Sequence, residues 1–211
     1  MAAVNEEASA LDGRALGKRG AATRQRLLES TGDLLESKGL RDLRVVDIAR
    51  EVGTSPATFY QYFRDVEAAV LALAEMVGEQ TAPLVDGLDA RWTGRDGLDR
   101  ARDLVDGFLV YWDEHRAILR TRNLAAQEGD QRFRNVRNQS LQPITQALSR
   151  KVTQNAVAGI DPYAAAAALV AMMERMAAFH VDLEPYGPSR ADVVETTARI
   201  VYQTVTGPIG P

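Results

Sequence analysis

Cysteine is absent from this 211-residue sequence, and histidine is nearly absent, with only His115 and His180. Without thiols the chain cannot form a disulfide framework, a cysteine-ligated zinc finger, an iron–sulfur cluster or a thiol nucleophile. The two histidines lie far apart in the sequence and lack paired carboxylates at metal-ligand spacing, so we expect no metal site and no cofactor. The sequence also contains no nucleophile elbow and no phosphate-binding loop, and we therefore expect no enzymatic activity.

Long apolar runs are also missing. We find no stretch of about 18 apolar residues that could span a bilayer, and the first residues lack the basic-then-apolar order of a secretory signal. The sequence therefore predicts a cytoplasmic protein with no membrane partner. Residues 1–18 are rich in Ala, Gly and charge without an apolar period, and we expect them to form a mobile tail.

Strand patterns are absent too. Alternation of apolar and polar residues occurs nowhere along the chain, whereas apolar residues recur at helical spacing after residue 20, which predicts an all-α fold. The first helix is expected over 21–37, stopping before Gly39. A short helix from Val45 then ends at Gly53. Further helices are expected over 57–63, from an Asp65 cap onward, and over 96–114, 116–127, 130–156, 162–182 and 189–206. This makes about nine helices in all.

Charge is low in net terms and unevenly distributed. The net charge of −4 is unfavourable for a general nucleic-acid binder, because DNA binding depends largely on neutralising phosphates. Residues 13–64, however, contain ten Lys and Arg against six Asp and Glu, whereas residues 65–211 contain 15 against 20. A basic N-terminal module followed by an acidic body is typical of a DNA-binding regulator. We expect a tail over 1–18, a helix-turn-helix domain over 19–79 and a ligand-binding and dimerisation domain over 80–211.

The segment 45–63, VVDIAREVGTSPATFYQYF, has the composition of a helix-turn-helix unit. Ala49 is small where two helices cross closely, and Gly53 can adopt the turn conformation between them. Ser55 is a suitable N-cap for the second helix of the unit. Consecutive aromatics on so short a helix cannot all point into a core, which disfavours a plain pair of packed helices. The side chains expected to be displayed are Ala57, Thr58, Tyr60, Gln61 and Tyr62, which are types that contact phosphates or base edges.

Residues 19–79 resemble the TetR/AcrR family of repressors through the order of a first helix ending in Gly, then IA, G, SP, TFY and YF. The resemblance implies that the helix after Pro56 is the recognition helix, held in the major groove of double-stranded DNA. It assigns DNA contacts to Tyr60 and Tyr62, a groove position to Ala57 and Thr58 after the Ser55 cap, and base reading to Gln61.

Two positions depart from the family pattern. Arg44 stands where a Ser or Thr usually caps the second helix, and Val66 stands where a lysine usually begins the fourth. Arg44 and Arg64 are the predicted substitutes for the displaced phosphate contact, although an arginine on a surface helix is by default solvated.

The body carries an apolar stripe along helix 96–114 that would normally be core. The TetR/AcrR resemblance implies that such a body holds a small ligand between its middle helices, and FLVYWDEHRAILR and MMERMAAF are similar to the branch that contains the ethionamide-resistance repressor. On this basis the residues predicted to line an apolar cavity are Phe108, Trp112, Asn123, Val170, Met173 and Met176. A cavity of this type favours a hydrophobic small-molecule effector.

The last two predicted helices, 162–182 and 189–206, carry the expected homodimer interface. The first has a run of alanines that allows close approach, and the second has one apolar stripe. Its members are Val193, Val194, Thr197, Ile200, Val201 and Thr204. The resemblance implies a dimer that presents two recognition helices to a pseudo-palindromic operator. The same stripe would serve equally well for packing within the chain.

The sequence thus predicts a dimeric, ligand-responsive repressor. A second hypothesis keeps the DNA-binding domain and makes the body a constitutive dimerisation module with a filled core. A third is a helical enzyme or lipid carrier in which the helix-turn-helix pattern is a coincidence.

Overall fold

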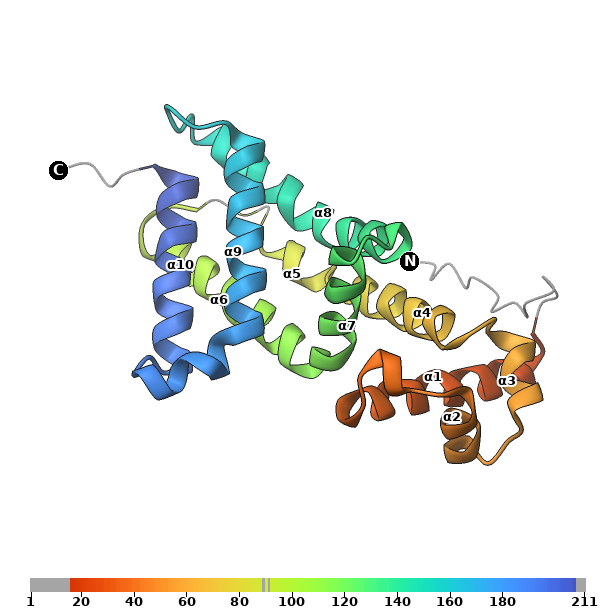
Figure 1. Ribbon diagram of the computed structural model, residues 1–211. Helices are drawn as coiled ribbons and strands as arrows, with labels where there is room; N and C mark the ends of the chain where they lie inside the picture. The colour runs from red at the N-terminus through yellow and green to blue at the C-terminus, as the bar shows by residue number, and fades with distance from the viewer. Residues whose placement is uncertain (1–15, 89, 91, 208–211) are drawn as a thin grey trace. The chain divides into compact units, whose positions relative to one another are not determined.

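The structure, a computed structural model, describes residues 16–88, 90 and 92–207. Within these residues it contains α-helices and two 3₁₀ turns but no β-strand (Figure 1). The elements are α1 (Lys18–Ser37), η1 (Leu40–Asp42), α2 (Val45–Val52), α3 (Pro56–Tyr62), α4 (Val66–Glu79), α5 (Pro83–Asp86), α6 (Gly94–Glu114), α7 (Arg116–Gln127), α8 (Gln131–Gln154), α9 (Pro162–Leu183), η2 (Glu184–Tyr186) and α10 (Arg190–Thr206). The all-α prediction is confirmed, with nine described helices of seven residues or more and α5 as a single turn.

The predicted tail lies mostly outside the described residues. Its last member, Lys18, already belongs to α1.

Capping residues set the helix boundaries in the helix-turn-helix region. Gly53 ends α2 with φ of 71°, a left-handed conformation that glycine adopts without steric cost. The Ser55 hydroxyl accepts the Thr58 backbone N–H at 3.2 Å and so caps α3. The Asp65 carboxylate accepts the Ala68 backbone N–H at 2.7 Å and begins α4. These local interactions explain why the two short helices begin and end within one or two residues of the predicted positions.

The described chain divides into two compact units. Unit 1 contains the described residues up to Met76 together with Ala117–Val136, and unit 2 contains Val77–Arg116 and the described residues from Arg137 onward. This division differs from the expected one, in which 80–211 formed a single domain, because α7 and the first turn of α8 belong with the N-terminal helices.

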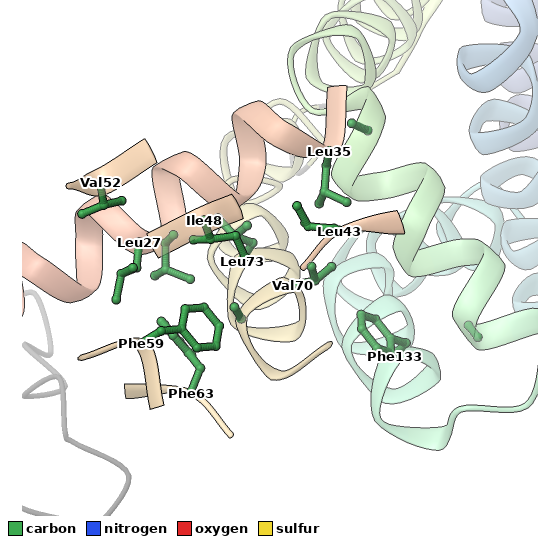
Figure 2. Close-up of a cluster of buried hydrophobic side chains, with 14 residues drawn as sticks. Leu27, Leu35, Leu43, Ile48, Val52, Phe59, Phe63, Val70, Leu73 and Phe133 are labelled. Atoms are coloured by element: carbon green, nitrogen blue, oxygen red, sulfur yellow. The ribbon is translucent and has the colours of Figure 1, made fainter. Parts of the chain in front are cut away.

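Unit 1 has one cluster of buried apolar side chains drawn from its helices (Figure 2). Helices α1, α2 and α3 pack against one another around it. The buried members are Leu27, Leu28, Leu35, Leu43, Ile48, Val52, Phe59, Phe63, Ala69, Val70, Leu73, Ala117, Ala126 and Phe133. Ala117, Ala126 and Phe133 show why the segment 117–136 joins this unit: its apolar face completes the core beneath the helix-turn-helix. Fully burying one such phenylalanine or leucine stabilises a fold by about 1.5–3 kcal/mol.

Unit 2 is organised around α6, which packs against both α9 and α10. Gly97 allows the close approach of α6 to its surroundings, since a Cβ there would lie 2.7 Å from the Trp92 carbonyl carbon and 2.8 Å from the Tyr202 ring. A bidentate ion pair between Arg102 and Glu195, with N–O distances of 2.6 and 3.0 Å, connects α6 to α10. Surface pairs of this kind supplement the buried apolar contacts.

A second ion pair in unit 2 connects α8 to α9 through Arg137 and Glu174. The Glu174 side chain is only 8% exposed, whereas that of Arg137 is 32% exposed. The carboxylate therefore depends on this guanidinium much more than an exposed acid would.

The predicted apolar stripe on α10 is exposed only in part. Val193, Thr197 and Val201 are buried within the chain, whereas Ile200 remains 42% exposed. The expectation of an outward stripe is thus wrong for those three residues, because α6 and α9 cover that side of α10.

Two described segments, Val66–Asp86 and Pro162–Tyr186, are long and apolar enough by composition to cross a membrane, which was not expected from the sequence. In the first, buried Ala69, Val70 and Leu73 supply the apolar character, as in a core helix of a globular protein. In the second, Leu169, Val170 and Met173 are buried in the same way, and much of the exposed side consists of alanines.

Candidate nucleic-acid interface

Seven of the eight residues predicted to contact DNA lie in α3 or beside its ends, and Arg44 lies at the start of α2. The structure leaves Arg44, Ser55, Ala57, Tyr60, Gln61 and Arg64 exposed, and it half-buries Thr58 and Tyr62. All eight belong to unit 1. The predicted contact set thus lies on one short helix and its flanking residues, with Arg44 as the exception.

Phe59 in α3 and Phe63 directly after it are buried in the core, which leaves the other side of the helix exposed. Phe59 is fully buried, and its ring centroid lies 5.5 Å from that of Phe63, which follows the last residue of the helix. Tyr60 meets Phe59 edge to face at 5.9 Å and is nevertheless 53% exposed. An exposed phenol fixed against a buried ring is well suited to donate a hydrogen bond to a phosphate or base edge.

The hydroxyls at the start of α3 are held by each other. Ser55 Oγ and Thr58 Oγ1 lie 3.0 Å apart, and the Ser55 oxygen also accepts the Thr58 amide. This arrangement fixes Thr58 in the first turn of the helix. Each hydroxyl retains further hydrogen-bonding capacity for a partner in solution.

Tyr62 is less displayed than the sequence led us to expect. It lies three residues after Phe59, so the two share a helix face, and its ring packs partly against the core cluster of unit 1. Among the tyrosines of α3, Tyr60 therefore presents the larger exposed surface.

The two predicted phosphate-binding arginines differ in their surroundings. Arg44 occupies the N-cap position of α2 and makes no side-chain capping bond there. Arg64 donates from Nε to Asp65 at 2.9 Å while its side chain stays 68% exposed. A phosphate that binds Arg64 must therefore compete with the Asp65 carboxylate.

Acidic residues near these arginines are kept ionised by their partners. A hydrogen bond from Lys38 Nζ, 3.1 Å away, lowers the pKa of Asp47 in the first turn of α2. Burial tends to raise the pKa of Asp65, but the Ala68 amide and Arg64 outweigh it, so that this pKa lies below its ordinary value. Both carboxylates are thus negative at neutral pH and help to stabilise helix N-termini.

Arg24 on α1 contributes to this region and was not predicted from the sequence. Its guanidinium lies 5.1 Å from the centroid of the Phe63 ring, at the end of α3, and burial lowers its pKa. The signal was available in the spacing, because Arg24 precedes the core residue Leu28 by one helical turn. Arg24 thus packs on the core residue that ends α3 and helps to hold that helix.

The residues predicted to line an effector cavity fall into two groups. Phe108, Trp112, Val170 and Met173 are buried in unit 2, where α6 packs against α9, and Met176 is half-buried. Asn123 belongs to unit 1, where its Oδ1 accepts a hydrogen bond from Arg122 Nε at 3.1 Å. The burial of Phe108 and Trp112 agrees with the stripe on α6 being core.

A groove lies elsewhere in unit 2, on the outward side of α9 and α10. Its volume is about 440 Å³, and its lining residues are Ile160, Asp161, Ala164, Ala165, Ala168, Leu169, Met172, Ile200 and Thr204. None of the six residues predicted to bind an effector lines this groove. It lies instead on the two helices expected to form the dimer interface.

Family comparison identifies the chain. Residues 83–211 match the family of tetracyclin repressor-like C-terminal domains, and residues 27–73 match the bacterial regulatory proteins of the tetR family. The chain belongs to the TetR family. The all-α fold, the helix-turn-helix and the predicted family are confirmed together.

The relatives of this TetR-family protein match it in part of their length. It is 31% identical over 94 residues to the HTH-type transcriptional regulator EthR of Mycobacterium tuberculosis, which covers 44% of each chain. The chain therefore aligns with less than half of that relative.

Solved structures with the same fold align over most of the chain. The fatty acid degradation regulator FadR from Bacillus halodurans has a TM-score of 0.64 at 14% identity and covers 94% of this chain and all of that one, 100%. The FadR of Bacillus subtilis, in complex with stearoyl-CoA, has a TM-score of 0.63 at 13% identity, covering 87% and 98% of the two chains. At these identities the likeness concerns the fold alone.

Proposed function

We propose that this TetR-family protein is a cytoplasmic, dimeric transcriptional repressor that binds a pseudo-palindromic operator through α3 and releases it when a hydrophobic effector binds. The observation that carries the proposal is the display of Tyr60 and Gln61 on a helix whose opposite side is locked into the core by Phe59. That combination presents hydrogen-bonding side chains in a fixed geometry, which is what reading a major groove requires.

Fluorescence anisotropy with the DNA that flanks the protein's own gene tests the DNA-binding role. We expect Tyr60→Ala or Gln61→Ala to weaken specific binding by about 1–3 kcal/mol for each base-specific hydrogen bond removed and to relax sequence preference. Arg44→Ala should instead weaken all sequences alike and reduce the salt dependence. The exposed Gln146 on α8 provides a matched control, since Gln146→Ala removes the same functional group from a helix of unit 2 that is outside the proposed dimer interface. Unchanged binding by both recognition-helix variants would reject the assignment.

The effector proposal rests on the apolar interior of unit 2 and on the FadR relative crystallised with stearoyl-CoA. Phe108, Trp112 and Met173 offer aromatic and flexible surfaces suited to a long apolar guest. Stearoyl-CoA is therefore the first probe to use. A ligand that binds only the folded protein must raise its Tm in proportion to occupancy.

The alternative of a constitutive regulator is favoured by the complete burial of Phe108 and Met173, whose side chains already pack within the interior of unit 2. The thermal-shift measurement separates the two candidates. A Tm that rises with stearoyl-CoA in the wild type, but not in a Trp112→Ala variant, supports the effector site, and a flat response to a panel of apolar ligands supports the constitutive form.

A homodimer through α9 and α10 completes the proposal. Both helices retain exposed apolar residues on their outward sides, among them Phe179, Ile200 and the groove-lining alanines. Two copies related by a two-fold axis would present two α3 helices to the two half-sites of an operator.

A further inference from the structure

The outward side of α9 has a hollow half and a protruding half. The hollow half is the groove of about 440 Å³ near the N-terminal end of the helix, where Ala164, Ala165 and Ala168 supply no bulk. The protruding half is formed by Phe179, which is 38% exposed, and by Arg175, whose guanidinium lies 3.8 Å from the centroid of the Phe179 ring. The stacking holds the ring in place while part of it stays in contact with solvent.

Both halves lie on one stripe of the helix. Ala165, Ala168, Met172, Arg175 and Phe179 follow each other at spacings of three and four residues, which places them on the same face. Ala165 and Phe179 are separated by about 21 Å along the axis, at 1.5 Å per residue, and Met172 is midway between them. The groove and the protruding ring are therefore two ends of one surface.

This surface carries few charges, one of which is the exposed Asp161 at the groove. Between Ala164 and Phe179, in a helix that the structure describes throughout, Arg175 is the one exposed charged side chain, because Glu174 is buried. A helix with an apolar outward side of this extent is stable in solution when something covers it. The 22 residues of α9 alongside the 17 of α10 present a face of about 30 by 20 Å, roughly 600 Å². That approaches the area of about 800 Å² per partner that a stable dimer buries.

Two-fold symmetry requires such a surface to be complementary to itself. A parallel arrangement of the two α9 helices would set Phe179 against the partner's Phe179, groove against groove, and Arg175 against the partner's Arg175. Like charges brought together in an interface are unfavourable. An antiparallel arrangement centred on Met172 would place Phe179 at the level of the partner's Ala165 and would separate the two Arg175 positions by about 9 Å along the axis.

We propose that, in the dimer, α9 packs antiparallel to its copy across a two-fold axis at Met172, and that Phe179 of each subunit fills the alanine-lined groove of the other. This inference rests on the proposed dimeric function and adds the identity of the occupant of the groove. The groove is then a socket for a side chain of the second copy rather than a ligand site.

Engineered cysteines test the antiparallel direction in a protein that has no native cysteine. In the full-length protein, Met172→Cys places two thiols next to each other at the axis, within the distance that a disulfide needs. Ala165→Cys places them about 21 Å apart along the axis, beyond reach. Mild oxidation should therefore cross-link the Met172→Cys dimer and leave the Ala165→Cys protein unlinked. Cross-linking of Ala165→Cys at a similar yield would overturn the antiparallel arrangement.

A complementation experiment tests the ring and the groove. Phe179→Ala removes the ring and Ala168→Phe fills the groove, so each change should raise the dimer Kd by on the order of tenfold or more in sedimentation experiments. Mixed together, the two variants should form a heterodimer with a lower Kd than either homodimer. In it, one wild-type ring enters a wild-type groove, and the new phenylalanine occupies the space left by the missing ring. Tyr163→Ala is the matched control, since it removes an exposed aromatic from another face of α9.

Circular dichroism establishes that the variants remain helical. The proposed dimeric function and the proposed ring-in-groove packing are contradicted by different results. If the wild type is monomeric at micromolar concentration, the dimeric function is wrong. If the wild type is dimeric but Phe179→Ala leaves its Kd unchanged, or the mixed variants show no preference for each other, the dimer stands and the ring-in-groove packing is wrong.

Discussion

At the scale of single residues, the helix-turn-helix depends on backbone and capping positions as much as on its displayed side chains. Gly53 adopts the left-handed conformation that ends α2, and the Ser55 and Asp65 side chains cap the first turns of α3 and α4. Such positions affect DNA binding indirectly, through the stability of the unit that holds Tyr60 and Gln61.

Gly53→Ala should lower the free energy of unfolding by about 1–2 kcal/mol, the penalty for a side chain in the left-handed region. A Cβ at this position would meet no atom within 4 Å, so the effect is conformational and not steric. Gly53→Asn should be less destabilising, because asparagine tolerates this conformation. Gly39→Ala is the control, since Gly39 has an ordinary φ of −71°. Urea denaturation measures the differences, and equal destabilisation by Gly39→Ala and Gly53→Ala would contradict the explanation.

Asp65→Ala should destabilise the protein by about 1 kcal/mol at pH 7 through loss of the α4 cap. Because the pKa of Asp65 is lowered in the folded state, its contribution is complete above the ordinary pKa of about 3.9 and is lost as the pH falls through the lowered value. The difference between wild type and variant should therefore shrink below about pH 4. Asp65→Asn, which retains a capping oxygen, should show a weaker pH dependence. Thermal denaturation from pH 7 to pH 3 follows both, and a difference that stays constant to pH 3 would exclude the ionised cap.

At the scale of elements, the sequence predicts the helices well and their partners less well. Helical periodicity and caps placed α7 at its observed bounds and α9 within one residue. The short elements η1, η2 and α5 carry too few residues for a periodic pattern, so they were missed. The packing of 117–136 with the N-terminal helices, and the burial of Val193 and Val201, depend on contacts between distant segments that no local pattern encodes.

Two of the inter-helix ion pairs of unit 2, Arg137–Glu174 and Arg102–Glu195, should differ in importance. Arg137→Ala leaves the buried Glu174 carboxylate without this guanidinium, and we expect a loss of about 2 kcal/mol, below the usual range for a buried pair because Arg137 is partly exposed. Arg102→Ala removes a pair whose members are both about a third exposed, and its effect should be smaller and weaken further with added salt. Denaturation at low and high salt compares them. A salt-sensitive loss for Arg137→Ala as small as that for Arg102→Ala would show that burial does not distinguish the pairs.

At the scale of the whole molecule, charge is divided unevenly between the basic N-terminal segment and the acidic remainder of the chain. The basic N-terminal segment attracts phosphates, while the acidic remainder opposes loose association with DNA of any sequence. In the proposed repressor, sequence specificity comes from the few side chains displayed on α3. The helix-turn-helix is a local motif, so the placement of Tyr60 and Gln61 on the exposed side of α3 could be predicted, whereas the burial of Phe108 and Met173 depends on the tertiary packing of α6 against α9.

Thermodynamic linkage gives the most demanding prediction for the proposed repressor. If stearoyl-CoA lowers operator affinity, operator DNA must lower the affinity for stearoyl-CoA by the same factor, typically 5–150-fold, or about 1–3 kcal/mol. Anisotropy measures the first factor and calorimetry of the protein–DNA complex the second, at one salt concentration, since DNA affinity varies steeply with salt. In Trp112→Ala the two factors should remain equal to each other whatever the loss of effector affinity, because both express one coupling free energy. Tyr60→Ala should weaken DNA binding while effector affinity in the free protein stays unchanged. If stearoyl-CoA binds but neither affinity changes, both factors equal one. The ligand then binds the DNA-bound and the free protein equally well, and the protein does not respond to it as a regulator.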